Sequence, residues 1–489
     1  MADSPKKYGP WIAGGWHQPE QGHYQITGPA TEEPVGYASE GHASEGHAAE
    51  VWIAAKAARS ALREWSCTDP GERADVLERA GALISDRVGE LVPLVRAESG
   101  ATTSVAESNL VLAAADCFRR AARSAREFGP VVRVPQPVAA SLLSAGGLIG
   151  VAARRRPLGV VGCITSHNFP IAHLVAMVAP AVAMGNTVVA KPAPQDPLGF
   201  LELGPIMKEA GVPDGVFNVV TGSGPITNEA LIANYDIDII SFSGTAAMGR
   251  RIAEFASKQL KTTRMVLGGK GVVIVLEDAD DRALELAVLA GSLNFSLHSG
   301  QVGPAPARML VHRSLYEKVV DGLARHAQSV PVGNPADHST VVGPLISDAQ
   351  RDHVEAAVEE ARQQGARVAA GGERSPIKPG FYTAPHVLAD VTEDMAVARE
   401  GIAGPVVVVI PFDDEDEAVR IAGGGAPAAS HDYVFSGDAA HAWGVATRLR
   451  GGSVGINTAE LHPETYVLRD ACPFEARTYS EVQPIVWTA

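Results

Sequence analysis

The stretch FSGTAAMG, residues 242 to 249, has the residue types of a phosphate-binding turn. It closes an apolar run that predicts a strand, and it opens a predicted helix. The free backbone N–H groups and the dipole at the start of that helix could hold a pyrophosphate. The turn would be formed by Ser243, Gly244, Thr245 and Gly249. Taken alone, the stretch is better explained as an ordinary strand-to-helix turn.

The composition is typical of a large globular protein. The chain has 489 residues, of which 46% are hydrophobic and 20% are charged, and this length predicts two or three domains. The formal charge of −15 and the absence of a Lys/Arg stripe argue against a nucleic acid partner. The N-terminus lacks the apolar core of a signal peptide, and Gly185 and Asn186 interrupt the most apolar stretch, so we expect no membrane span.

The four cysteines, Cys67, Cys117, Cys163 and Cys472, are widely spaced along the chain. They form no metal-ligand pattern, so the sequence predicts no metal site. Unpaired thiols are typical of a reducing compartment, and we therefore expect a cytoplasmic protein.

Apolar, β-rich runs alternate with helical segments through the middle of the chain. The predicted strands PLGVVGCI, NTVVAKP, GVFNVVTG and DIDIISFSG are separated by predicted helices. A second series runs from GVVIVLED (271 to 278) to PVVVVIPFDD (405 to 414). Repeated βα units indicate parallel sheets covered on both faces. The expected fold class is therefore α/β, with two doubly wound domains.

Six motifs follow one another along these units. They are ITSHNFP (164 to 170), GNTVVAKPAP (185 to 194), FSGTAAMG (242 to 249), VLGGKG (266 to 271), SGQVGPAPAR (299 to 308) and GPVVVVIPF (404 to 412). Each motif is weak alone, but the ordered set resembles the aldehyde dehydrogenase superfamily. The resemblance extends over almost the whole chain and implies an aldehyde-dehydrogenase-like fold.

The resemblance also implies roles for individual residues. Asn168 matches the amide that stabilises an oxyanion together with a backbone N–H at the nucleophile position. Lys191 matches the lysine that reaches the adenosine ribose or a 2′-phosphate. The glutamate that often follows three residues later is Pro194 here, which weakens the case for NAD and leaves NADP open.

Other family positions carry unexpected residues. The nucleophilic cysteine is replaced by Gly303 and the general base by Val266. The glutamate that holds the nicotinamide ribose and the nearby phenylalanine are replaced by Gly401 and Ala403. Glycine and valine supply neither a nucleophile nor a proton acceptor. The resemblance therefore predicts a divergent member that cannot run the family's cysteine-dependent oxidation.

Three hypotheses about function follow. The first is a repurposed, non-redox enzyme acting on a small carbonyl or imine compound, with Asn168, His167 and His298 as catalytic candidates, because imidazole titrates near neutral pH. Histidines that are merely hydrogen-bonded in a pocket fit His167 and His298 equally well. The second is a catalytically silent homologue that serves as a partner subunit or ligand sensor. The third is an NAD(P)-dependent aldehyde dehydrogenase with a relocated nucleophile, for which Cys472 is the candidate.

The losses at Pro194 and Gly401 also lead to an expectation about the cofactor. Each missing carboxylate would have made charge-assisted hydrogen bonds worth about 1.5–3 kcal/mol. We therefore expect that no cofactor is required, or that NADP or NAD binds only weakly.

The chain is expected to form three regions. Residues 1–125 and 150–265 would form a dinucleotide-binding-type, Rossmann-like domain, and residues 266–460 a catalytic-type α/β domain. Residues 126–149 and 478–489 would form oligomerisation strands. Extended strands without charge leave an exposed edge, so a homodimer or homotetramer is expected.

Overall fold

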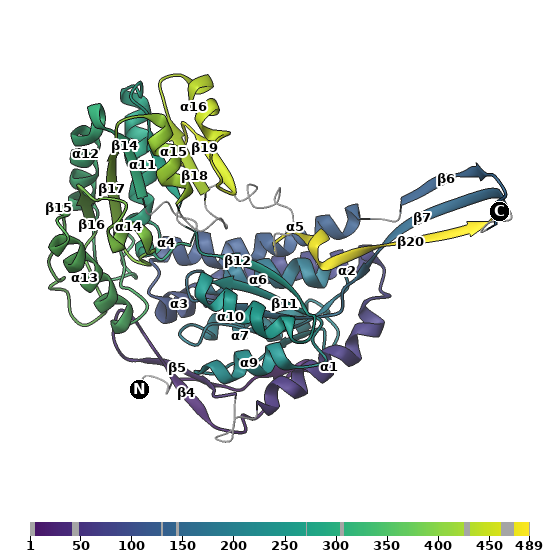
Figure 1. Cartoon of the computed structure of the whole chain (residues 1–489). Helices are drawn as coiled ribbons and strands as arrows, with labels where there is room; N and C mark the ends of the chain where they lie inside the picture. Colours follow the sequence, from purple (N-terminus) through teal and green to yellow (C-terminus); the bar gives the residue numbers. More distant parts are fainter. Residues whose placement is uncertain are drawn as a thin grey trace.

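A computed structural model of the chain describes residues 5–41, 48–128, 131–142, 146–269, 271–303, 308–424, 431–460 and 474–488. These residues contain two seven-stranded sheets and two three-stranded sheets (Figure 1). One of the small sheets joins β1 (Lys7–Tyr8), β5 (Pro34–Ser39) and β4 (His23–Thr27) near the N-terminus. The predicted α/β fold class is confirmed. The boundaries of the predicted domains stay a prediction.

The first large sheet has the order β12-β11-β8-β9-β10-β2-β3. Its parallel strands are β8 (Val160–Thr165), β9 (Thr187–Lys191), β10 (Phe217–Val219), β11 (Ile239–Gly244) and β12 (Thr262–Leu267), and the short β2 (Trp11–Ile12) and β3 (Gly15–Trp16) close one edge. Every residue of β8 and β9 is buried. Because helices cover both faces, the strands are apolar on both sides, as a parallel sheet requires.

Helices leave the sheet in opposite directions at β8 and β11. Helix α6 (Pro170–Ala183) follows β8 and shares a core with Cys163, whereas α10 (Ala246–Ser257) follows β11 and shares the opposite core with Ile164. Strands β8 and β11 are direct neighbours, while their connections run to β9 on one side and β12 on the other. Such a topological switch point opens a crevice at the carboxyl ends of the strands, where ligands of open α/β sheets bind.

The remaining helices around this sheet complete its two layers. They are α1 (Ala49–Trp65), α2 (Pro70–Asp86), α3 (Val88–Ser99), α4 (Thr103–Val105), the π-helical segment η1 (Ala106–Leu112), α5 (Ala113–Glu127), α7 (Leu198–Leu201), α8 (Leu203–Glu209) and α9 (Pro225–Ala233). Helices α2, α5 and α6 pack side by side on one face. Helices α1, α9 and α10 share the core on the other face.

The second large sheet has the order β15-β16-β17-β14-β13-β18-β19. Its strands are β13 (Val272–Val275), β14 (Arg308–His312), β15 (Arg367–Ala370), β16 (His386–Ala389), β17 (Val406–Phe412), β18 (His431–Phe435) and β19 (Ser453–Ile456). Helices α11 (Asp281–Ser296) and α12 (Tyr316–Ser329) cover one face. Helices α13 (Asp348–Gln363), α15 (Glu415–Gly423) and α16 (Ala439–Ala446) cover the other. The short α14 (Ala396–Arg399) precedes β17.

A three-stranded arm projects from the body of the molecule (Figure 1). It consists of β6 (Val131–Val138), β7 (Gly147–Pro157) and β20 (Ser480–Thr488), and β7 pairs antiparallel with both neighbours. The buried Asn186 anchors the base of the arm, because its Oδ1 accepts from the N–H of Leu158 at 2.8 Å and its Nδ2 donates to the carbonyl of Tyr479 at 2.9 Å. The arm therefore has a fixed root in the first sheet.

No helix among the described residues has both the length and the apolar character that a membrane crossing requires.

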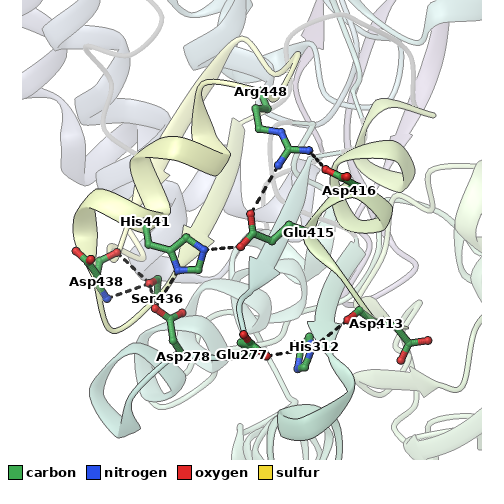
Figure 2. A network of polar contacts seen from close by, with 10 residues as sticks. All are labelled: Glu277, Asp278, His312, Asp413, Glu415, Asp416, Ser436, Asp438, His441 and Arg448. Atoms are coloured by element: carbon green, nitrogen blue, oxygen red, sulfur yellow. Dashed lines mark hydrogen bonds and ion pairs between the residues drawn. The ribbon is translucent and has the colours of Figure 1, made fainter.

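A polar network joins three segments at the carboxyl ends of β13, β17 and β18 (Figure 2). The ring of His441, on α16, contacts Asp278 through Nδ1 at 3.0 Å and Glu415, at the start of α15, through Nε2 at 2.5 Å. Arg448 pairs with Glu415 and with Asp416. The hydrogen bonds to Asp278 and Glu415 raise the pKa of His441 to about 9. The imidazolium thus links the starts of α15 and α16 to the loop after β13.

Replacing His441 with Gln should change how stability depends on pH. Because the pKa of His441 is raised from 6.5 to about 9, the stabilisation by the imidazolium is complete below pH 6.5 and is lost as the pH rises through 9. His441 is partly exposed, so solvent screening limits the effect to roughly 1 kcal/mol. Urea unfolding should show a wild-type advantage over His441→Gln at pH 6 that disappears at pH 10. An advantage that is equal at both pH values would contradict this assignment.

Candidate functional site

A cavity of about 1310 Å³ lies between the two large sheets. On one side it is lined by segments at the carboxyl ends of strands of the first sheet: residues 166–169 directly after β8, 243–247 at the end of β11 and beyond it, and 266–269 at the end of β12 and beyond it. On the other side it is lined by residues 302–303 and 399–403, which precede β14 and β17. The cavity therefore occupies the predicted crevice at the switch point, facing the amino ends of the second sheet.

The start of α10 forms one end of the cavity. Ser243, Gly244 and Thr245, which belong to the predicted turn, line it. Thr245 caps the helix, its Oγ1 accepting from the N–H of Met248 at 3.3 Å. Ala246 and Ala247 also line the cavity, and Arg250 lies one turn further on. First-turn N–H groups and a guanidinium make this end suitable for an anionic pyrophosphate.

Gly249 has a different role from the one predicted. It is buried and does not line the cavity. A Cβ at this position would lie 2.4 Å from Cδ2 of Leu267, on β12. The glycine therefore permits close packing of α10 on the sheet and makes no contact within the cavity.

Lys191 ends β9 and is only 2% exposed. Burial lowers its pKa to about 8, while Asp196 and Glu40 oppose the shift. Lys191 is not among the residues that line the cavity. Its predicted contact with an adenosine ribose therefore stays a prediction.

His167, Asn168, Val266 and Gly303 meet in the cavity, although they come from three separate segments. The Nε2 atom of His167 is buried and has no hydrogen-bond partner among the described residues. Burial lowers the pKa of His167 to about 4. This imidazole is therefore neutral at pH 7 and a weak base, which limits the acid–base role proposed for it.

His298 lies behind the cavity wall. It is 2% exposed, and its ring packs edge-on against Phe169 with the centroids 5.6 Å apart. Burial, with a smaller contribution from His167, lowers its pKa to about 3. Phe169 lines the cavity and His298 does not, so the structure does not bring His298 to the site with the other predicted residues.

The space beside Gly303 and Gly401 is open. Among the described residues, no heavy atom beyond the chain neighbours lies within 4 Å of a Cβ built on Gly303 or on Gly401. Both glycines line the cavity, together with Val266 and Ala403.

The thiols that the structure describes are poor replacements for a nucleophile at Gly303. Cys67 is exposed at the end of α1, and Cys163 is enclosed within β8, where burial raises its pKa. Cys117 lines the cavity, but burial raises its pKa as well. Cys472 lies outside the described residues.

The sequence did not predict that side chains of α5 would line the cavity. Cys117, Arg120 and Arg123 line the cavity from this helix, beside Ala113 and Ala121. Their helical spacing of three and four residues was the available signal, because it places them on one face. No sequence feature indicated that this face would border a cavity.

The comparisons with known proteins agree with this arrangement. The sequence model of the aldehyde dehydrogenase family matches residues 16–467, and the chain therefore belongs to the aldehyde dehydrogenase family. It is 36% identical over 468 residues to vanillin dehydrogenase of Amycolatopsis sp., covering 94% of this chain and 90% of that protein.

Two solved structures are also similar. One is an NAD+ complex of aldehyde dehydrogenase from Bacillus cereus, with a TM-score of 0.87, 31% identity and coverage of 99% of this chain and 96% of that chain. The other is a mutant of aldehyde dehydrogenase C from Pseudomonas syringae in complex with NAD+ and octanal, with a TM-score of 0.86, 34% identity and coverage of 98% and 96%.

These comparisons contradict the expectation that no cofactor is required or that NADP or NAD binds weakly. That expectation gave too much weight to two absent carboxylates, at Pro194 and Gly401. The groups that line the cavity at the start of α10 include backbone N–H groups, which do not depend on the residue types at positions 194 and 401.

Gly303→Cys should be tolerated, because the position is open. We expect its free energy of unfolding to stay within about 0.5 kcal/mol of wild type. The matched control is Gly300→Cys: Gly300 has φ of +71°, and a Cβ there would lie 2.0 Å from the carbonyl oxygen of Gly404, so this variant should be clearly destabilised. Urea unfolding of the two variants measures the difference. An equal decrease of the free energy of unfolding in both variants would show that the region around Gly303 is not open.

Proposed function

We propose that the protein binds NAD(P) in this cavity and performs NAD(P)-dependent redox chemistry on a small-molecule aldehyde. The observation that carries the proposal is the continuity of the cavity, which runs from the first turn of α10 to Asn168 and Gly303. One cavity can therefore hold a dinucleotide and a carbonyl compound side by side. The names of its relatives, which include vanillin dehydrogenase, support this substrate class.

Bound NAD(P) would supply a hydride acceptor or donor. The residues of this chain would do the rest. The first-turn N–H groups of α10 would bind the pyrophosphate, with Arg250 adding positive charge nearby. The side-chain amide of Asn168 would donate to the carbonyl oxygen of the aldehyde and stabilise negative charge there.

A covalent route would need a thiol from a position other than 303. Cys472 is the candidate, because Cys67, Cys117 and Cys163 are unsuitable by position or by raised pKa. In the sequence it stands two residues before Phe474, which lines the cavity. Attack by its thiolate would form a bond to the carbonyl carbon and leave the oxyanion for Asn168 to stabilise.

Titration calorimetry of the full chain with NAD+ and NADP+ tests the proposal. We expect at least one of them to bind with a dissociation constant in the micromolar range, about −8 kcal/mol. Replacing Ala247, in the first turn of α10, with a bulky residue should abolish dinucleotide binding. Replacing Tyr235, which is exposed on the surface, should leave binding unchanged. Millimolar or weaker binding of both dinucleotides by the folded wild type would refute the proposal.

Cys472→Ala should abolish NAD(P)-dependent oxidation of aldehydes such as vanillin, while Cys67→Ala should leave it unchanged. Absorbance of the reduced cofactor at 340 nm measures both rates. Activity that persists in Cys472→Ala would exclude the covalent route.

The second candidate function is acid–base chemistry on a carbonyl or imine compound. It is favoured by the buried Nε2 of His167, which has no hydrogen-bond partner among the described residues. It requires turnover that is lost in His167→Ala.

We also propose that the arm of β6, β7 and β20 joins copies of the chain into a homodimer or homotetramer. Val132, Val134 and Val486 on the arm are 66%, 77% and 63% exposed, which is unfavourable in water. Light scattering at micromolar concentration should therefore report a dimer or tetramer. Val134→Lys combined with Val486→Lys should lower the mass, whereas Tyr235→Lys, away from the arm, should not. A monomeric wild type would contradict the proposal.

A further inference from the structure

Helix α5 carries four arginines with two kinds of surroundings. Arg119 pairs with Asp116 at 2.8 Å, and Arg126 pairs with Asp75 at 2.6 Å and with Glu78 at 2.5 Å. Arg120 and Arg123, by contrast, line the cavity. Neither has a carboxylate within ion-pair distance among the described residues. The helix thus presents two unneutralised guanidinium groups to the site.

Arg120 is held in place by a thiol. Its Nη2 donates to Sγ of Cys117, one turn earlier on the helix, at 3.0 Å. Cys117 is 9% exposed, and burial raises its pKa, so the sulfur stays a neutral thiol. The contact therefore orients the guanidinium without cancelling its charge.

The carboxylates near this end of the cavity do not balance the arginines. Glu475 lines the cavity, but its Oε2 already pairs with Nε of Arg477 at 2.7 Å. Glu127 also lines it, one turn beyond Arg123, and forms no ion pair within 4 Å among the described residues. The chain as a whole carries a charge of −15 and repels anions. A local excess of arginine is what an anionic ligand would need here.

The space between these arginines and Asn168 is lined in part by small apolar side chains. Its walls include the small side chains of Ala113, Ala121, Ala172 and Ala176. The ring of His173 stacks on Phe169 with the centroids 5.1 Å apart, and the centroid of the Phe474 ring lies 5.8 Å from that of His173. An apolar or aromatic body would fit between a carbonyl group at Asn168 and a charged group at α5.

We propose that the substrate aldehyde bears a carboxylate remote from its carbonyl group, and that Arg120 and Arg123 bind this carboxylate. The inference rests on the proposed function for the carbonyl end only. Guanidinium groups suit the recognition because they donate paired N–H groups to carboxylate oxygens.

The test compares two probes that differ in charge, 4-carboxybenzaldehyde and 4-methylbenzaldehyde, by titration calorimetry. Hydrogen bonds to a charged group are worth about 1.5–3 kcal/mol, so wild type should bind the carboxylate probe about ten- to a hundredfold more tightly. Arg120→Leu combined with Arg123→Leu should reduce this ratio to about one. The matched control, Arg126→Leu on the outer side of α5, should keep it.

Two further variants guard against a folding defect. Arg123→Leu alone changes an exposed residue, and it should lower the ratio severalfold with an unchanged melting temperature. Arg120→Lys keeps the charge and should retain most of the preference. A wild-type ratio near one, or a ratio that survives in the double variant, would overturn the proposal.

Titrating the same samples with NAD+ and NADP+ separates the two proposals. A carboxylate preference without dinucleotide binding would refute the proposed function and leave the anion site standing. Dinucleotide binding without the carboxylate preference would refute the proposed anion site and leave the proposed function standing.

Discussion

The pairing of β8 with β11 sets the position of everything else in the site. Their register aligns Thr165 with Ser243, and the N–H of Ser166 donates to the carbonyl of Ser243 at 3.0 Å just beyond the ladder. Because α6 and α10 then leave on opposite faces, a crevice opens at these two strand ends, and the cavity lies there. The cavity, the capped start of α10 and the placement of Asn168 all depend on this divergence.

Burial decides which polar groups in the site are available for chemistry. His167 and His298 are kept neutral by the cost of charging an imidazole away from water, and Cys117 is kept as a thiol for the same reason. A side chain in the site keeps its charge only where water or a hydrogen-bond partner reaches it, and Arg120, which donates to Sγ of Cys117, is an example. The site therefore depends more on fixed hydrogen-bond donors than on titrating side chains.

The sequence revealed the fold far better than the site. Runs such as NTVVAKP are buried on both faces, and this property follows from composition alone, so the parallel sheets were predictable. His298 was misplaced because its sequence neighbours say nothing of Phe169, which screens it. The cofactor expectation was wrong because backbone N–H groups at α10 do not depend on residue identity at Pro194 or Gly401. The cavity-facing side of α5 needed the tertiary structure, since helical spacing does not reveal what a face meets.

We propose that a dinucleotide binds at the divergence of β8 and β11 with its reactive end beside Gly303. A crystal structure of the full chain soaked with NAD+ or NADP+ tests it most directly. We expect pyrophosphate density at the N–H groups of the first turn of α10 and a nicotinamide ring near Asn168 and Gly303. An empty cavity at saturating dinucleotide, or a dinucleotide bound elsewhere on the chain, would contradict it.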